Sequence, residues 1–317
     1  MSSASAPLKL HKKKRMPLGR ALFIAAMVAY PLLQFLVFWA YVNVDTVIMS
    51  FQKLDYGLGR EVFVGWDNYA WVWNRLTNPD MPELRNSILN SIYLFLSNNF
   101  VLLPISVFCA YILHKKVPGS KIFRVIFFLP NIISVVVLTM AFSFMLNSSF
   151  GPVNSVLEAI GLGGLIPANG WLGDKSTVMP MVLIYCLWAG IGYNVVLLSG
   201  AINRIPNEIF EAGKMDGIPM WRELFQVVLP MLSGTITTLF VSGVGVIFTL
   251  FLQPMLLTGG GPYDGLSSTI ALYIMNLVNA NSLYRASAVG MIFTLIGVPL
   301  VQGVKWLMER FFPAVEY

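Results

Sequence analysis

The chain alternates long apolar runs that carry no charge with short charged segments. Six of these runs are long enough to cross the roughly 30 Å hydrocarbon core of a bilayer, and they are residues 21–42, 88–113, 125–146, 178–198, 232–257 and 286–304. Lipid offers the backbone no hydrogen-bond partners, so each run is predicted to be a helix. The pattern predicts an all-α integral membrane protein, with a six-span helical bundle over residues 21–308.

Composition agrees with this prediction. Only 11% of the residues are charged, against about 25% in an ordinary soluble domain. Cys109 and Cys186 lie inside apolar runs, where a thiol behaves as a small hydrophobic group. His11 and His114 are isolated from each other and from the cysteines, so no metal site is expected. The basic segment KLHKKKRMPLGR precedes an apolar run of 22 residues, which is longer than a signal-peptide core, and a retained first span is expected.

Lys and Arg are distributed unevenly between the two sides of the predicted spans. With the N-terminus in the cytoplasm, the segments on that side hold 15 basic residues and the opposite segments hold 6. Cytoplasmic loops carry such an excess. Both termini are therefore predicted to be cytoplasmic, as a basic segment at 1–20 and a short tail at 309–317. The net charge of +6 then reflects topology, and no nucleic-acid partner is expected.

The loop between the fourth and fifth spans, residues 204–230, is predicted to be a cytoplasmic helical hairpin. Pro206 suits the start of a helix, and Gly217 can adopt the positive φ that ends one. Pro219 begins a second helix, in which Trp221, Leu224, Phe225 and Val228 recur at helical spacing on one face. Such a small hairpin cannot bury this stripe alone, so the stripe requires either the protein's own spans or another protein.

The predicted outer segments are rich in aromatic residues and turns. The largest, 43–87, contains FVGWDNYAWVW, whose rings could anchor in lipid headgroups or contact sugars, and membrane anchoring is the favoured interpretation. GGGPYDGLSST lacks the lysine and the preceding strand of a phosphate-binding loop. The sequence shows no Ser/His/Asp set and no supported acid pair, Asp80 and Glu83 being the nearest, so no catalytic residue is expected.

The hairpin carries a recognisable motif. EAGKMDGIPMWRELFQVVLP (211–230) resembles the EAA loop of binding-protein-dependent ABC importer permeases, in which E-A-A is followed by three residues, a glycine and, further on, L-P. Matching positions are Glu211, Ala212, Asp216, Gly217, Leu229 and Pro230. The sequence departs from the motif at the second alanine, which is Gly213, a small residue that lowers local helix stability by up to about 1 kcal/mol.

Three other segments extend the resemblance along the chain. FVGWDNY (63–69), LTGGGPYDGLSSTIALYI (257–274) and ASAVGMIFTLI (286–296) are similar to segments of the sugar-importer subgroup. The LTGGGP element resembles the first-type subunit of a heterodimeric pair, the maltose-permease type. The resemblance implies a multi-pass protein of the bacterial cytoplasmic (inner) membrane that carries a carbohydrate inward.

The resemblance also implies partners. The hairpin would be a coupling helix that docks on an ABC ATPase subunit, through Glu211, Ala212, Gly213, Asp216, Gly217, Trp221 and Pro230. A second permease subunit, two ATPase subunits that bind ATP and Mg, and an extracytoplasmic solute-binding protein would complete the complex. The chain itself would need no cofactor, and ATP-driven closure of the ATPases would rock its spans between inward-open and outward-open states.

Uncharged polar residues at membrane depth are the candidates for a substrate pathway. They are Asn98, Asn99, Tyr193, Asn194, Ser199, Gln253 and Asn276, and each could instead form a hydrogen bond between helices. By resemblance, Tyr193 and Gly190 match positions of the maltose-permease type. We therefore take Tyr193, Asn194, Gly190, Gln253 and Asn98 as the predicted pathway.

The fifth span departs from the maltose-permease type. Its sugar-contacting polar positions fall on Gly243, Ile247 and Leu250, whose side chains cannot form hydrogen bonds. A maltose-type site is therefore expected to be absent or rebuilt.

Three other functions compete with a carbohydrate permease. A secondary transporter would need an ionisable coupling residue at mid-membrane, and the six runs contain none. A membrane enzyme lacks a catalytic set. An ABC permease for a non-sugar solute conflicts with VGWDNY and LTGGGP, by resemblance only.

Overall fold

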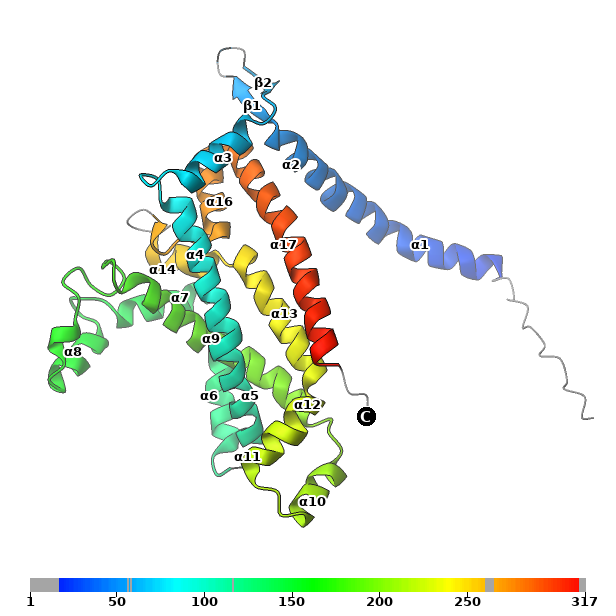
Figure 1. The fold of residues 1–317 in the computed structure, drawn as a ribbon, viewed down its shortest axis with the longest axis vertical. Coiled ribbons are helices and arrows are strands. Elements are labelled where there is room, and N and C mark those ends of the chain that lie inside the picture. The colour runs from blue at the N-terminus through cyan, green and yellow to red at the C-terminus, as the bar shows by residue number, and fades with distance from the viewer. Residues whose placement is uncertain (1–16, 56, 58, 116, 260–264, 314–317) are drawn as a thin grey trace, which may run out of the picture. The chain divides into compact units, whose positions relative to one another are not determined.

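A computed structural model describes residues 17–313 apart from 56, 58, 116 and 260–264, and these residues separate into two compact units (Figure 1). The first unit ends at Met49. It contains α1 (Leu18–Phe35), the π-helical segment η1 (Leu36–Tyr41) and most of α2 (Val42–Ser50), which form one apolar helix of 33 residues. The predicted first span is part of this helix, whereas most of the predicted N-terminal segment 1–20 lies outside the described residues.

The second unit begins with an element that the sequence did not predict. Strands β1 (Gln52–Asp55) and β2 (Arg60–Phe63) pair antiparallel, with Gln52 opposite Phe63. Helix α3 (Asp67–Thr77) follows, and the Asn68 side chain fixes its start by donating to the backbone oxygens of Ser50 and Gln52. The all-α prediction is therefore wrong at this hairpin, because a polar loop outside the apolar runs can satisfy its backbone by strand pairing.

The second predicted span is a helix with a π-helical interruption. It comprises α4 (Glu83–Leu96), η2 (Ser97–Leu102) and α5 (Leu103–His114). Proline cannot donate a backbone hydrogen bond and its ring crowds the preceding turn. The widened π turn lies directly before Pro104, which occupies the first turn of α5, and this placement lets the helix continue through the proline.

The third predicted span is not one helix, which corrects the sequence prediction. Helix α6 (Ser120–Ile132) and helix α7 (Val135–Met145) meet at an angle of 105°. Ile133 and Ser134 between them are extended, with ψ values of 140° and 135°. The hydrophobicity of an apolar run does not indicate where its helix breaks. A break is tolerated because neighbouring protein can satisfy the freed backbone groups.

The predicted fourth span is one continuous helix, α9 (Val178–Ile202), and it is preceded by α8 (Pro152–Ala159) and the short turn η3 (Gly163–Leu165). The loop around α8 is organised by polar side chains, among them Trp171, whose Nε1 donates to Asn154 Oδ1 at 2.7 Å. Hydrogen bonds from the Ser176 hydroxyl and backbone lower the pKa of the Asp174 carboxyl from its ordinary value.

The loop between the predicted fourth and fifth spans is a helical hairpin, as predicted. Its elements are α10 (Asn207–Met215), α11 (Met220–Glu223), the π-helical segment η4 (Leu224–Val228) and α12 (Leu229–Met231). We refer to residues 207–231 as the hairpin. Helix α13 (Ser233–Thr249) then departs at an angle of 74° from the segment Met220–Met231.

The fifth predicted span, 232–257, is also broken, which is a second correction. Helix α13 ends at Thr249, and a separate helix, α14 (Leu252–Thr258), follows. Pro254 favours the break, because a proline ring clashes with the carbonyl four residues earlier. That carbonyl belongs to Leu250, and it accepts a hydrogen bond from the Thr269 hydroxyl at 2.5 Å instead.

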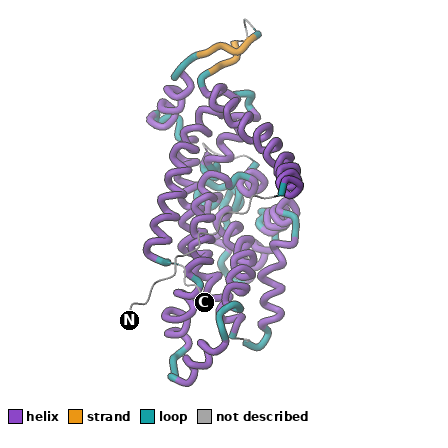
Figure 2. The backbone as a smooth tube through the Cα atoms, turned by 90° about the vertical axis from the view of Figure 1, so that its right-hand side faces the viewer, coloured by secondary structure: helices purple, strands orange, loops and turns teal. Residues whose placement is uncertain are grey.

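Helices α16 (Ile270–Asn279) and α17 (Leu283–Phe311) complete the described chain. Residues 260–262 of the LTGGGP element and residues 314–317 of the predicted tail 309–317 lie outside the described residues. Within the part of the chain that the structure describes, four helices are continuous, long and apolar enough to span a membrane, and up to six spans result if each bent pair counts as one. In the second unit, the β1–β2 hairpin and the hairpin 207–231 lie at opposite ends of the helices (Figure 2).

Candidate functional site

The turn of the hairpin is a complete Schellman motif around Gly217. Gly217 has a φ of 65°, a conformation that costs a residue with a side chain roughly 1–2 kcal/mol. The Gly217 N–H donates to the Lys214 oxygen at 3.1 Å, and the Ile218 N–H donates to the Gly213 oxygen at 3.0 Å. Both bonds satisfy carbonyls that the end of α10 leaves free. The sequence prediction of a positive φ at Gly217 is confirmed.

Gly213 occupies a different environment from Gly217. It is buried in α10 and has an ordinary helical φ. A Cβ at this position would lie 3.9 Å from Ile218 Cδ1, which is ordinary van der Waals contact. The alanine that the resembling motif carries here would therefore fit without displacing a neighbour.

The hairpin presents an exposed surface at its tip. Glu211, Ala212 and Asp216 are exposed, and Met215 is 89% exposed. Nothing among the described residues covers them, so this surface is available to another protein.

The predicted apolar stripe does not lie on a single face, which corrects the sequence prediction. Leu224 and Val228 are buried against α5 and α9, in a core cluster that also includes Phe210. Trp221 and Phe225 stay exposed, and Trp221 stacks on Phe108 with ring centroids 5.5 Å apart. The π turn of η4 changes the helical period, so residues spaced for one α-helical face separate into a buried and an exposed pair.

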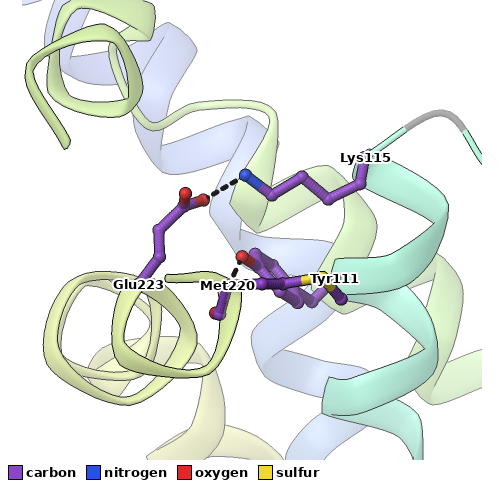
Figure 3. Close-up of polar contacts among 4 residues, drawn as sticks. All are labelled: Tyr111, Lys115, Met220 and Glu223. Carbon is purple, nitrogen blue, oxygen red and sulfur yellow. Dashed lines mark hydrogen bonds and ion pairs between the residues drawn. The ribbon is translucent and has the colours of Figure 1, made fainter. Parts of the chain in front are cut away.

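A charged junction holds the hairpin against the end of α5 (Figure 3). Lys115 Nζ lies 2.5 Å from Glu223 Oε1, and the Glu223 side chain is only 5% exposed. The buried Tyr111 hydroxyl donates to the Met220 backbone oxygen at 3.1 Å. Lys115 also lies over the rings of Tyr111 and Phe210, 5.3 and 5.6 Å from their centroids. We call Tyr111, Lys115, Met220 and Glu223 the junction.

A cavity of about 290 Å³ lies among the broken helices. Its wall includes residues of α4 and η2, the break between α6 and α7, the middle of α9, and the break between α13 and α14. Discontinuous helices expose backbone groups that water or a polar solute can satisfy, and transporters commonly bind substrate at such places. An uncharged polar solute in this cavity would find hydrogen-bond partners on its wall.

The cavity unites three of the predicted pathway residues and leaves out two. Asn98, Gly190 and Gln253 line it, whereas Tyr193 and Asn194 do not. Tyr193 is 57% exposed and Asn194 is buried elsewhere in α9. The polar lining that sequence analysis missed consists of Ser97, Asn131 and Tyr185. Asn131 directly follows Pro130 inside an apolar run. A polar residue beside a proline within such a run is the sequence signal that could have identified this lining residue.

The lining contains no Asp, Glu, Lys, Arg or His. Two of its amide side chains are held by protein contacts. Asn131 donates to the Ala189 oxygen at 3.2 Å, and Asn98 donates to Asn99 Oδ1 at 3.2 Å. The cavity is therefore neutral, with amide and hydroxyl groups on an apolar wall.

Gly243 shows why one position of the predicted fifth span carries no polar side chain. A Cβ at Gly243 would lie 1.9 Å from Asn99 Oδ1 and 2.5 Å from Asn98 Nδ2. The two amides of η2 fill the space that a side chain at this position would need. Asn99 also donates to the Phe240 oxygen at 3.1 Å, which ties η2 to α13. Beside position 243 the polar groups therefore come from the predicted second span, whereas the predicted fifth span contributes Gln253 to the cavity.

The structure offers no metal centre among the described residues, where no three His, Cys, Asp or Glu side chains gather in a position to hold an ion.

The broken helices, neutral cavity and exposed hairpin define a helical membrane transport protein. The chain belongs to the family described as binding-protein-dependent transport system inner membrane component, whose model matches residues 102–316. This family supplies the membrane component of ABC importers, and it is a transport family, not a catalytic one.

The relatives include permease proteins of the maltose/maltodextrin transport system. The chain is 32% identical over 242 residues to the probable ABC transporter permease protein YurN of Bacillus subtilis (strain 168), covering 73% of this chain and 77% of that protein. It is 29% identical over 211 residues to the maltose/maltodextrin transport system permease protein MalF of Klebsiella aerogenes, with 67% and 40% covered. MalF of Escherichia coli (strain K12) is 27% identical over 267 residues, with 80% and 51% covered. The chain thus spans about half or less of the MalF length.

Solved structures share the fold. A chain of a bacterial ABC transporter involved in the import of the acidic polysaccharide alginate aligns with a TM-score of 0.78 at 20% identity, covering 92% of this chain and 97% of that one. The alginate transporter in complex with an alginate pentasaccharide-bound periplasmic protein aligns with a TM-score of 0.79, also at 20% identity, covering 94% and 98%. At this identity the likeness establishes the architecture alone.

Proposed function

We propose that this chain is a permease subunit of a carbohydrate ABC importer in the bacterial cytoplasmic membrane. The observation that carries the proposal is the hairpin. Its motif residues form a capped turn with an exposed tip, and this turn follows a helix that lines the cavity. A displacement applied at the tip would reach the cavity through packed helices, as rigid-body gating between two states requires.

The proposed topology has six spans, with each bent pair counted as one. The basic-residue distribution places the hairpin, the N-terminal segment 1–20 and the tail 309–317 in the cytoplasm. The position of the β1–β2 hairpin at the opposite end of the second unit agrees with this topology, because a loop in the outer solvent must lie across the membrane from a cytoplasmic one. The permease domain then comprises residues 21–308.

The proposed partners follow from the same assignment. Two ATPase subunits would bind ATP and Mg and receive the hairpin through Glu211, Ala212, Gly213, Asp216, Gly217, Trp221 and Pro230. A second permease would complete a heterodimer, and an extracytoplasmic binding protein would deliver the solute. The fold is shared with a transporter that was solved together with its periplasmic binding protein, which supports this arrangement.

The neutral cavity supports a carbohydrate as the solute. Amide and hydroxyl side chains exchange hydrogen bonds with sugar hydroxyls, and the apolar wall suits the faces of sugar rings. We propose Asn98, Gly190 and Gln253 as its pathway residues in this chain. Tyr193 and Asn194 remain pathway candidates only for a conformation in which α9 presents its other face. A non-sugar solute of neutral charge is the alternative that the same lining permits.

A reconstituted complex tests this function. The chain is co-purified with its membrane and ATPase partners, placed in liposomes, and supplied with the binding protein and radiolabelled neutral oligosaccharides. Uptake is expected to require ATP inside the liposomes. Uptake without ATPase subunits would indicate a secondary transporter, and uptake of amino acids in place of sugars would favour the alternative solute.

The hairpin has a matched pair of substitutions for this assay. Glu211→Ala removes an exposed carboxylate of the motif, whereas Glu208→Ala removes an exposed carboxylate one turn earlier on the same helix. We expect Glu211→Ala to abolish uptake without changing solute binding by the binding protein, and Glu208→Ala to leave uptake within about twofold of the native rate, since surface substitutions away from special features have small effects. Equal uptake by both variants would contradict the coupling role.

A further inference from the structure

The junction between α5 and the hairpin has a chemistry that simple packing does not require. Glu223 is almost fully buried, and its carboxylate is paired with Lys115 at 2.5 Å. A buried charge is costly unless it is paired and hydrogen-bonded, and an apolar pair of similar volume often serves stability as well or better. Lys115 lies outside the segment 211–230 that resembles the EAA loop, and Glu223 lies within it but is not one of its matching positions.

The contacts of the junction are directional. The Tyr111 hydroxyl reaches the Met220 backbone oxygen, so α5 is bonded to the first turn of α11 as well as to the Glu223 side chain (Figure 3). Apolar contacts in the surrounding cluster, such as those of Leu224, are non-directional. Helices held by apolar contacts alone can slide along each other, whereas an ion pair combined with a hydrogen bond fixes their register.

Helix α5 has one end at the hairpin and the other end next to the cavity wall, and transport must connect these two places. His114 and Lys115 form its end at the hairpin, and at its other end η2 places Asn98 and Leu102 in the cavity wall. The 12 residues of α5 span roughly 18 Å at the usual helical rise. Along this length α5 is packed against α9, which also lines the cavity.

We propose that Lys115 and Glu223 are positioning residues for transport: their ion pair makes α5 move together with the hairpin, so that displacement of the hairpin reaches the η2 wall of the cavity. This proposal rests on the proposed function of the hairpin. It assigns to the pair the transmission of movement, and not the docking of the ATPase.

Single and double substitutions separate transmission from simple charge compensation. Lys115→Met keeps the apolar stem, and Glu223→Gln keeps the shape of the side chain. Each single variant leaves one charge unpaired and is expected to lower assembly of the complex. The double variant Lys115→Met/Glu223→Gln has no unpaired charge. It is therefore expected to assemble with native yield and thermal stability, although the ion pair between α5 and the hairpin is absent.

The deciding measurement is the number of solute molecules transported per ATP hydrolysed in liposomes. We expect the double variant to keep at least half of the native ATPase rate and to transport at least tenfold less solute per ATP. Lys115→Arg, which preserves the cation, is expected to stay within about threefold of the native ratio. The control Lys305→Met/Glu309→Gln removes an exposed ion pair near the end of α17 and is expected to leave the ratio unchanged.

Two results overturn the proposal. If the double variant assembles and transports at the native ratio, the ion pair only compensates buried charge. If the control lowers the ratio as strongly, the effect is not specific to the junction. Failure of the native complex to transport any carbohydrate would instead refute the proposed function, which keeps the two failures distinguishable.

Discussion

At the scale of the residue, two glycines illustrate how space and conformation impose different requirements. Position 217 requires glycine because of its backbone conformation, since a φ of 65° closes the turn of the hairpin. Position 243 requires glycine because of its surroundings, since the amides of Asn98 and Asn99 occupy the volume that a side chain would need. The first requirement can be predicted from a local motif, whereas the second exists only once η2 and α13 are in contact.

Gly243→Ala tests this close approach. The new methyl group would force the Asn98 and Asn99 amides out of place, and overpacking of this kind costs about 1–3 kcal/mol. We expect a lower thermal denaturation midpoint for the purified complex and at least tenfold slower solute uptake. Gly245→Ala is the matched control on the same helix, since a Cβ there would meet no atom within 4 Å. Comparable losses in both variants would contradict the spatial argument.

At the scale of the element, the broken helices depend on replacement partners for backbone groups. The break between α13 and α14 frees the Leu250 carbonyl, and Thr269 satisfies it. The same hydroxyl oxygen accepts from the Leu272 N–H at 3.2 Å and caps α16. One side chain therefore stabilises the end of one helix and the start of another.

Thr269→Val removes both interactions while keeping the shape of the side chain. Loss of a helix cap and of a partner for a buried carbonyl together cost about 1–3 kcal/mol. The expected result is a lower denaturation midpoint of the detergent-solubilised complex. Thr294→Val serves as the control, because this hydroxyl is exposed and bonds only within its own helix, to the Gly290 oxygen. An unchanged midpoint for Thr269→Val would show that the Leu250 carbonyl has another partner.

At the scale of the whole molecule, the distribution of basic residues predicts which end of the second unit faces the cytoplasm. The hairpin at one end of its helices and the β1–β2 hairpin at the other are predicted to face opposite sides of the membrane.

Cysteine labelling tests this orientation. Met215→Cys places a thiol at the hairpin tip, where the native side chain is 89% exposed, and Phe63→Cys places one on β2, where it is 73% exposed. A membrane-impermeant maleimide is expected to label Phe63→Cys in intact cells and Met215→Cys only in inside-out vesicles. The native chain, which contains Cys109 and Cys186, sets the background. The reverse pattern would overturn the topology and the docking of an ATPase on the hairpin.

Much of the architecture was predictable from the sequence, and the parts that were not share a cause. The apolar runs located the membrane-length helices, and the local chemistry of Asp216, Gly217 and Pro219 located the hairpin turn. The breaks at 133–134 and 250–251 were not predicted. A proline such as Pro254 is compatible with either a continuous or a broken span, and tertiary partners such as Thr269 decide between them.

The candidate site divides in the same way. Asn98 and Gln253 were found because polar residues at membrane depth are conspicuous, but hydropathy does not tell which face of a helix meets lipid and which meets protein, since both surroundings are apolar. Tyr193 and Asn194 therefore looked equivalent to Asn98, and Asn131 and Tyr185 were missed.

The sequence by itself determined that this protein lies in a membrane, which segments contain its long apolar helices, and where its hairpin turns, because hydropathy and glycine conformation act locally along the chain. Only the tertiary structure decided which helices break, which side chains share the cavity, and that Lys115 meets a carboxylate 108 positions away at Glu223. Such contacts depend on how the helices pack against one another, and no local pattern of residues encodes that packing.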